Sequence, residues 1–213
     1  MGTRTFDALN AAIQSGDKEK SLRVAKRMYR EFEAMHDLLV KWLAANYNYL
    51  YGKYGDAGLY EALQAACGVW GKDLIGLYAG KSAEQIMEML VMGIRGHLQS
   101  LRIEEDDEKY TVYCDPCGSG GRLARTGVYE KGTFAKIKKP QAMTYGQADY
   151  PVYCAHCTFQ EIIPIEATGK PIFITEPPPS DQIGKAPCKL LIYKDPNKIP
   201  EKYYTKVGKK KKA

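Results

Sequence analysis

Hydrophobic residues in the first half of the chain recur with the period of an α-helix. Between residues 18 and 51 they stand three or four positions apart, which places them on one face of a single long helix. The members of this face are Leu22, Ala25, Tyr29, Phe32, His36, Leu39, Leu43, Asn46 and Leu50. Gly52 and Gly55 predict its end, because glycine disfavours the interior of a helix.

Further helices are expected on both sides of this one. A short helix should end at Gly16, and another should occupy residues 56–67. Ser82 and Gln85 have the spacing of a capping box, in which each side chain satisfies a backbone donor of the other residue. They predict the start of a last helix, which we expect to run to about Ile103.

The pattern changes near residue 108 to short runs typical of strands. All 11 prolines lie beyond this point, and the expected strands are residues 111–113, 127–129, 150–153, 161–166, 171–175 and 189–193, with a turn at 167–170. The sequence therefore predicts an α+β protein, with an N-terminal helical bundle followed by a small antiparallel β domain. The expected divisions are a helical domain at 1–108, a metal-binding β domain at 109–200 and a basic tail at 201–213.

Two Cys-x-x-Cys pairs carry the strongest chemical signal. The pairs are Cys114 with Cys117 and Cys154 with Cys157. A tight turn with a cysteine at each end supplies two thiolates, and two such turns complete a tetrahedral four-thiolate site. This arrangement resembles the zinc ribbon, which implies a structural zinc ion held between two hairpins in a small β domain.

The spacing of the two pairs leaves alternatives open. Residues 118–153 separate the pairs, against about 12–20 residues in compact zinc modules. An iron–sulfur cluster uses the same four ligands, but zinc is favoured because the spacing does not match ferredoxin runs. His156 lies inside the second pair, where it would either replace a cysteine ligand or act as an acid–base group. Cys67 and Cys188 are interpreted as ordinary buried residues.

A glycine-rich segment follows the first pair directly. Successive glycines let backbone N–H groups converge on an anion, and two arginines add forked donors for a carboxylate or phosphate. The candidate ligand-binding residues are Gly118, Ser119, Gly120, Gly121, Arg122 and Arg125. The alternative, weighed equally, is a turn whose glycines permit tight packing around the metal.

Two histidines fall on apolar helical faces. His36 belongs to the face of the long helix, and His97 falls on the face that Ile86, Leu90 and Ile94 begin. A polar group that is buried needs a partner, and a lone histidine in such a place is usually a satisfied core residue. Two of them on neighbouring helices raise the alternative of a shared acid–base site.

The net charge of +6 is unevenly distributed. Residues 1–108 carry −3, residues 109–200 carry +4 and residues 201–213 carry +5. Most of the excess therefore lies in a lysine-rich tail, which is commonly a solvated chain end. No apolar run is long enough for a membrane span and no secretory signal is evident, so a cytoplasmic protein without membrane contact is expected.

Two functions fit these residues. The favoured hypothesis is a zinc-containing enzyme or ligand-binding protein with a pocket between its domains. His36, His97 and His156 would supply acid–base chemistry for a hydrolase or lyase, and the glycine-rich segment would hold a small anionic, carboxylated substrate. The alternative is a zinc-ribbon adaptor that binds nucleic acid or a protein through Lys136, Lys138, Lys139 and the tail. The substrate, the reaction and the oligomeric state stay open.

Overall fold

The computed structural model describes residues 2–212, which divide into two compact units, unit 1 at residues 1–42 and unit 2 at residues 43–213. The described chain is 57% helical and 12% strand, and it confirms the expected α+β class. The division does not coincide with the expected boundary near residue 108. The reason is that helical segments before that boundary share a core with the sheet that follows it.

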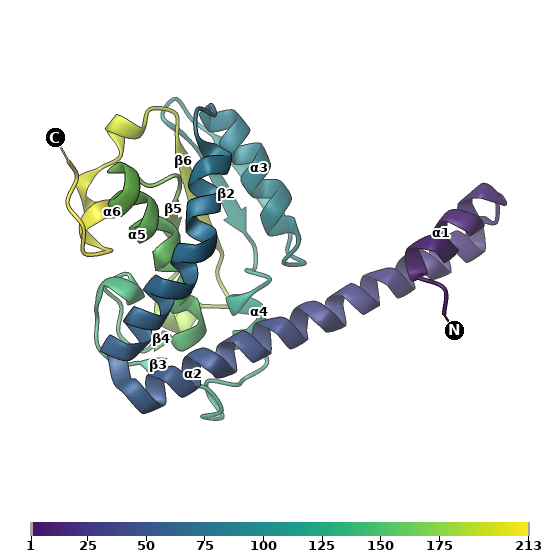
Figure 1. Cartoon of the computed structure of the whole chain (residues 1–213), viewed down its shortest axis with the longest axis horizontal. Coiled ribbons are helices and arrows are strands. Elements are labelled where there is room, and N and C mark those ends of the chain that lie inside the picture. The colour runs from purple at the N-terminus through teal and green to yellow at the C-terminus, as the bar shows by residue number, and fades with distance from the viewer. Residues whose placement is uncertain (1, 213) are drawn as a thin grey trace. The chain divides into compact units, whose positions relative to one another are not determined.

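Unit 1 consists of α1 (Thr5–Gln14) and the first part of α2 (Lys18–Tyr78). Both are coloured purple to blue in Figure 1. Asp17 caps the start of α2, since its side chain accepts a hydrogen bond from the backbone N–H of Lys20 at 2.9 Å. The hydroxyl of Thr5 donates to Glu31 at 2.6 Å and ties α1 to α2.

The long helix continues past the glycines that were expected to end it. Gly55 alone leaves the helical conformation, at φ 67° and ψ −162°, and helix resumes immediately to Tyr78. This last part of α2 lies against α5 (His156–Thr168), where the rings of Tyr60 and Phe159 are 5.1 Å apart. Gly71 allows the close approach, because a Cβ atom there would stand 2.9 Å from the side chain of Ile163.

An antiparallel four-stranded sheet forms the centre of unit 2, in the order β1-β2-β6-β5. Its strands are β1 (Leu101–Glu105), β2 (Lys109–Cys114), β5 (Ile174–Glu176) and β6 (Cys188–Tyr193). A second pair joins β3 (Lys136–Ile137) and β4 (Tyr150–Pro151). Helix α3 (Ala83–Arg95) packs Leu90 and Val91 on the sheet, against Val112, Leu190 and Ile192.

Several sequence expectations are corrected here. The capping box of Ser82 and Gln85 is confirmed, but α3 ends at Arg95 rather than Ile103, because the chain turns into β1. Residues 161–166 are helical in α5 and not a strand, since Ile163 packs on Gly71 of α2 while the helix also contacts β5. The expected strand at 127–129 is absent from the described structure, where those residues form turns.

The last residues are folded rather than a solvated tail. Helix α6 (Glu201–Thr205) buries Tyr203 and Tyr204, and Val207 is 1% exposed. The remaining short helices are α4 (Gly120–Ala124) and four 3₁₀ turns at Ala142–Thr144, Val152–Ala155, Ser180–Gln182 and Pro196–Lys198. None of the described helices combines the length and the apolar character that a membrane crossing requires.

Candidate functional sites

Five of the six cysteines gather at one end of the sheet in unit 2. Cys114 ends β2 and lies opposite Cys188 in the register with β6. The thiol of Cys188 is hydrogen-bonded to Cys117. The second pair approaches through α4, because a Cβ atom on Gly120 would stand 2.5 Å from Cys154 Sγ. The sequence interpretation of Cys188 as an ordinary buried residue missed this neighbourhood.

The two pairs have different local structures. Cys114 and Cys117 flank a turn that leaves a strand, as in a zinc ribbon. Cys154 and Cys157 lie where a 3₁₀ turn passes into α5, so the second pair is on a helix N-terminus and not on a hairpin. The resemblance to a zinc ribbon therefore extends to the first pair only.

The thiols of this cluster differ in acidity. Burial raises the pKa of Cys114 to about 12 and also raises that of Cys154 and Cys157. Cys117 is the exception, with a pKa lowered to about 6 by the hydrogen bond from Cys188, backbone N–H groups and the charge of Arg125. A single thiolate among protonated thiols is what mutual repulsion of close negative charges produces.

The cysteine thiols suit a metal such as zinc, but the side chains are not arranged as in a complete metal site. Within residues 2–212, no group of three or more His, Cys, Asp or Glu side chains has the arrangement that a metal ion needs. Thiols facing one another in a buried region are nevertheless the ligands that Zn²⁺ prefers. The four-cysteine zinc site thus stays a prediction, with Cys188 as an additional neighbouring thiol.

The glycine-rich segment packs tightly against the cysteines. A Cβ atom on Gly118 would stand 1.7 Å from the carbonyl oxygen of His97, and one on Gly121 would stand 2.9 Å from Cys117 Cβ. Arg125 donates to the carbonyl of Gly184 at 3.3 Å. Ser119 shares a hydrogen bond of 2.7 Å with the hydroxyl of Tyr153. These contacts favour the packing interpretation of the segment over anion binding.

The three histidines occupy three different settings. His36 lies in unit 1, is 8% exposed and has Nδ1 3.1 Å from Asp37 Oδ1. His97 lies in unit 2 and was wrongly placed on a helix, because α3 ends before it and the residue stands in the following turn. Of the two histidines expected on helices, only His36 therefore lies on one.

His156 belongs to the cysteine cluster. Its Nδ1 lies 2.6 Å from the carbonyl oxygen of Tyr153, and only an N–H at Nδ1 can make that hydrogen bond. Nε2 then carries the lone pair and stands 3.7 Å from Cys157 Sγ. Burial lowers the pKa of the ring, so a neutral imidazole is favoured. This tautomer suits a metal ligand or a thiol partner better than a solvent-facing acid.

A second site, which the sequence analysis missed entirely, lies one helical turn along α5 from Cys157. Glu161 is fully buried, and its Oε1 accepts a hydrogen bond from the backbone N–H of Thr175 at 2.9 Å. Its Oε2 stands 3.6 Å from Lys206 Nζ. Burial raises the pKa of Glu161 to about 7, although the charge of Lys206 opposes the shift.

Lys206 is equally constrained. Its Nζ donates to the carbonyl oxygen of Thr175 at 2.5 Å and lies 4.7 Å from the ring centroid of Tyr145 and 5.0 Å from that of Tyr203. Burial lowers its pKa. Both members of the pair are therefore displaced toward their neutral forms, which is characteristic of ionisable groups at functional sites.

Three buried oxygens beside this pair interact with one another and with Lys206 rather than each making a well-formed hydrogen bond. They are Glu161 Oε2, Tyr145 Oη and Thr175 Oγ1. A buried polar atom without a partner costs about 1–3 kcal/mol, and native proteins contain few of them. Tyr145 interacts with both Glu161 and Thr175, so these groups form a buried polar network next to Lys206.

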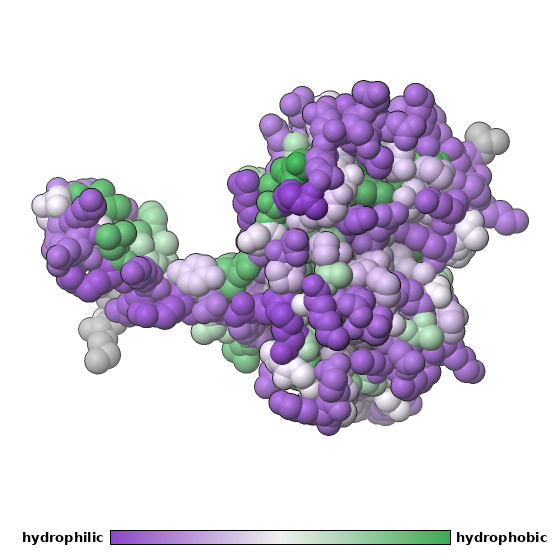
Figure 2. All heavy atoms as spheres, turned by 180° about the vertical axis from the view of Figure 1, so that it is seen from behind, coloured by the Kyte–Doolittle hydropathy of each residue, from purple (hydrophilic) through white to green (hydrophobic). Residues whose placement is uncertain are grey.

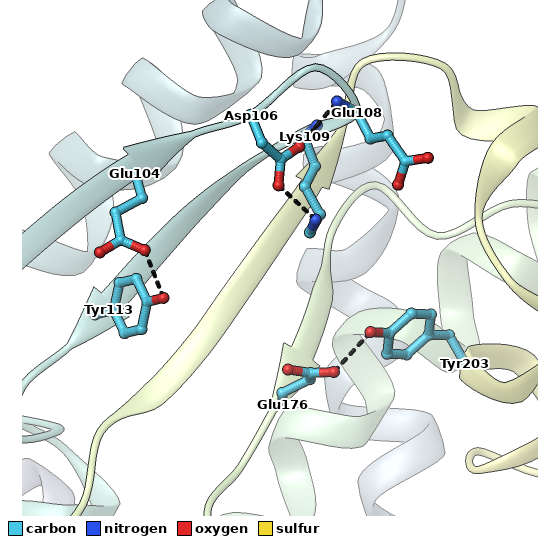
Figure 3. A network of polar contacts seen from close by, with 7 residues as sticks. All are labelled: Glu104, Asp106, Glu108, Lys109, Tyr113, Glu176 and Tyr203. Atoms are coloured by element: carbon cyan, nitrogen blue, oxygen red, sulfur yellow. Dashed lines mark hydrogen bonds and ion pairs between the residues drawn. The ribbon is translucent and has the colours of Figure 1, made fainter.

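A cavity of about 630 Å³ adjoins these groups. Its charged and aromatic lining consists of Tyr145, Glu176, Lys189, Lys202, Tyr203 and Lys206, completed by three successive prolines at 177–179. The one carboxylate among these residues, Glu176, accepts a hydrogen bond from Tyr203 at 2.6 Å, which Figure 3 shows. Three lysines therefore face a cavity with a single acidic group, so the local field favours anions.

Figure 3 also shows how the neighbouring surface differs. On the β1–β2 hairpin, Tyr113 donates to Glu104 at 2.7 Å and Lys109 pairs with Asp106 at 2.7 Å. These carboxylates are already engaged by hydroxyl and ammonium groups. The hairpin is thus internally satisfied, whereas the lysine-lined cavity is not.

Comparison of the whole chain with protein families, with curated proteins and with solved structures found no match.

Proposed function

We propose that unit 2 binds a small carboxylated molecule in the cavity lined by Lys189, Lys202 and Lys206. The observation that carries this proposal is the cavity itself, which is lined by three lysines and a single acid and adjoins the buried Glu161–Lys206 pair. A bound carboxylate would pair with the lysine ammonium groups and accept hydrogen bonds from them. The ligand is thereby recognised by both charge and hydrogen bonding.

The same geometry supports an enzyme of the hydrolase or lyase class. Glu161 and Lys206 together hold an easily shared proton, because the pKa of the acid is raised and that of the base is lowered. Such a pair delivers or accepts a proton near neutral pH, as general acid–base catalysis requires. His156 stays a candidate in the cysteine cluster rather than at this cavity.

Zinc enters the proposal as a structural element. The thiols of Cys114, Cys117, Cys154 and Cys157 would hold it, and the ion would fasten the end of the sheet to α4 and α5. A reducing compartment such as the cytoplasm would keep these thiols available. No observation favours the nucleic-acid adaptor, since Lys136 and Lys138 form ion pairs with Glu130 and Asp149.

Binding of small dicarboxylates, measured by isothermal titration calorimetry, tests the proposal. Lys202→Ala should weaken binding by about tenfold, the effect of about 1.4 kcal/mol, because it removes one ammonium group from the lining. Lys139→Ala is the matched control, since Lys139 is exposed and does not line the cavity. Affinity should also rise as pH falls through 7, because a protonated Glu161 leaves the charge of Lys206 to the ligand. Equal affinity in the two variants would contradict the proposal.

A further inference from the structure

Unit 1 exposes an unusual amount of apolar surface. Eight large apolar side chains of α2 within residues 22–42 are between 37% and 65% exposed, namely Leu22, Met28, Tyr29, Phe32, Met35, Leu38, Leu39 and Trp42. Figure 2 shows hydrophobic side chains at the surface of the α1–α2 hairpin. Helix α1 adds Phe6 at 58% and Ile13 at 59% exposure. Surface residues of this kind usually occur singly in a monomer.

All of these α2 residues except Leu38 follow a repeat of seven. Leu22, Tyr29 and His36 form one series and Ala25, Phe32 and Leu39 form a second, so apolar positions alternate at steps of three and four. Met28, Met35 and Trp42 form a third series of sevens beside them. A helix packed only on its own globule follows a period of 3.6, whereas a repeat of exactly seven keeps one seam turned toward a partner helix.

The exposed area is of the size that a stable pair of helices needs. Eight side chains about half-exposed amount to on the order of 650 Å², because a large aromatic side chain covers roughly 150–250 Å². A standard interface buries about 800 Å² on each partner. The largest apolar patch of an ordinary monomer is about 300–600 Å², so this face exceeds what a monomer commonly leaves uncovered.

The charges beside the seam select an orientation. Lys26 and Glu33 stand seven residues apart on one flank, and Met28, Met35 and Trp42 occupy the other. In a parallel pair, each flank would face the opposite flank of the partner, which would set Lys26 and Glu33 against apolar side chains. In an antiparallel pair, like flanks meet, so Lys26 of each copy faces Glu33 of the other and the apolar flanks pack together.

We propose that two copies of this chain associate through unit 1, as an antiparallel pair of α2 helices along residues 22–42. The interface is isologous, so one two-fold axis generates both Lys26–Glu33 contacts. This surface shares no residue with the ligand cavity of unit 2, and the proposal does not depend on the function proposed above.

Sedimentation equilibrium of the full chain tests the pairing. The wild type should have twice the chain mass of 23.9 kDa. Phe32→Glu combined with Leu39→Glu should give the single-chain mass, because the substitution sets like charges and polar groups in the seam. Lys41→Glu is the control and should remain dimeric, since Lys41 is exposed and lies outside all three series. Circular dichroism checks that each variant is folded.

A charge exchange tests the orientation. Lys26→Glu alone and Glu33→Lys alone should each raise the dimer dissociation constant by several fold, because like charges then meet twice. The two together should restore the wild-type value. A wild-type chain that sediments as a monomer would overturn the proposal, as would one that instead binds lipid vesicles through this face or a dimer that survives Phe32→Glu with Leu39→Glu. Failure of the double exchange to restore association would overturn the antiparallel arrangement.

Discussion

The two polar centres of unit 2 lie on α5 and on segments next to it, yet they are built in opposite ways. Around the cysteines, glycine backbone fills the space, and Gly120 stands so close that a Cβ atom would collide with Cys154 Sγ. Around Glu161 and Lys206, a buried polar network adjoins a cavity of about 630 Å³ that three lysines line. Close packing that excludes other molecules suits a structural centre, whereas a cavity lined by cationic side chains suits a site for an exchangeable ligand.

The largest expected effect comes from removing a thiol of the cysteine cluster. Cys154→Ser should release zinc and unfold unit 2, because a structural zinc site contributes about 10–16 kcal/mol in small domains while a whole protein is stable by about 5–15 kcal/mol. Elemental analysis and thermal unfolding measure the two losses. Cys67→Ala is the control, since Cys67 is also buried, at 2% exposure, but lies outside the two pairs. A Cys154→Ser protein that keeps its metal and its melting temperature would remove the structural zinc site.

A smaller effect, on the order of 3 kcal/mol, is expected at the Glu161–Lys206 pair. The pKa of Glu161 is about 7 in the folded protein against a usual 4.5, so the folded state holds this proton more tightly than the unfolded chain. The resulting stabilisation is complete below pH 4.5 and is lost as pH rises through 7, at 1.36 kcal/mol per unit of pKa. Above pH 7 the ionised carboxylate therefore destabilises the folded state.

Glu161→Gln isolates this contribution. The amide keeps an acceptor for the backbone N–H of Thr175 and cannot ionise. Relative to the wild type, the free energy of unfolding of Glu161→Gln should therefore rise by about 3 kcal/mol between pH 4.5 and pH 8. Urea denaturation at the two pH values measures it. Parallel pH profiles of the two proteins would show that Glu161 titrates normally, and the cavity would lose its distinguishing feature.

The two centres also differ in how far the sequence predicts them. The cysteine pairs are recognisable because ligand spacing is local, and the strands around Val112 and Leu190 follow from β-branched and aromatic runs. Cys188 is brought to the cluster by the pairing of β2 with β6, which no local pattern encodes.

The sequence analysis missed the Glu161 site for a different reason. The run around Ile162 and Ile163 is apolar on nearly every side and does not distinguish a buried helix from a strand. Its one signal is the acid within that run, because a buried carboxylate requires a partner. Lys206 was interpreted as part of a solvated tail because a run of lysines follows it. Tyr203, Tyr204 and Val207 nevertheless have the spacing of a helix that buries one face.

The smallest expected effect is a loss of about 1–3 kcal/mol in the free energy of unfolding, and it tests whether the cysteine cluster is closely packed. Gly120→Ala places a methyl group 2.5 Å from Cys154 Sγ, which is part of the buried core and cannot move aside freely. Overpacking of this kind costs about 1–3 kcal/mol. Gly68→Ala is the matched control, because Gly68 lies within α2 with open space around its Cβ position and should gain about 0.5–1 kcal/mol from helix propensity. Denaturant unfolding measures the free energy of unfolding of both variants. An equal increase in the two would mean that space remains beside the thiols, and would favour anion binding by the glycine-rich segment over its packing interpretation.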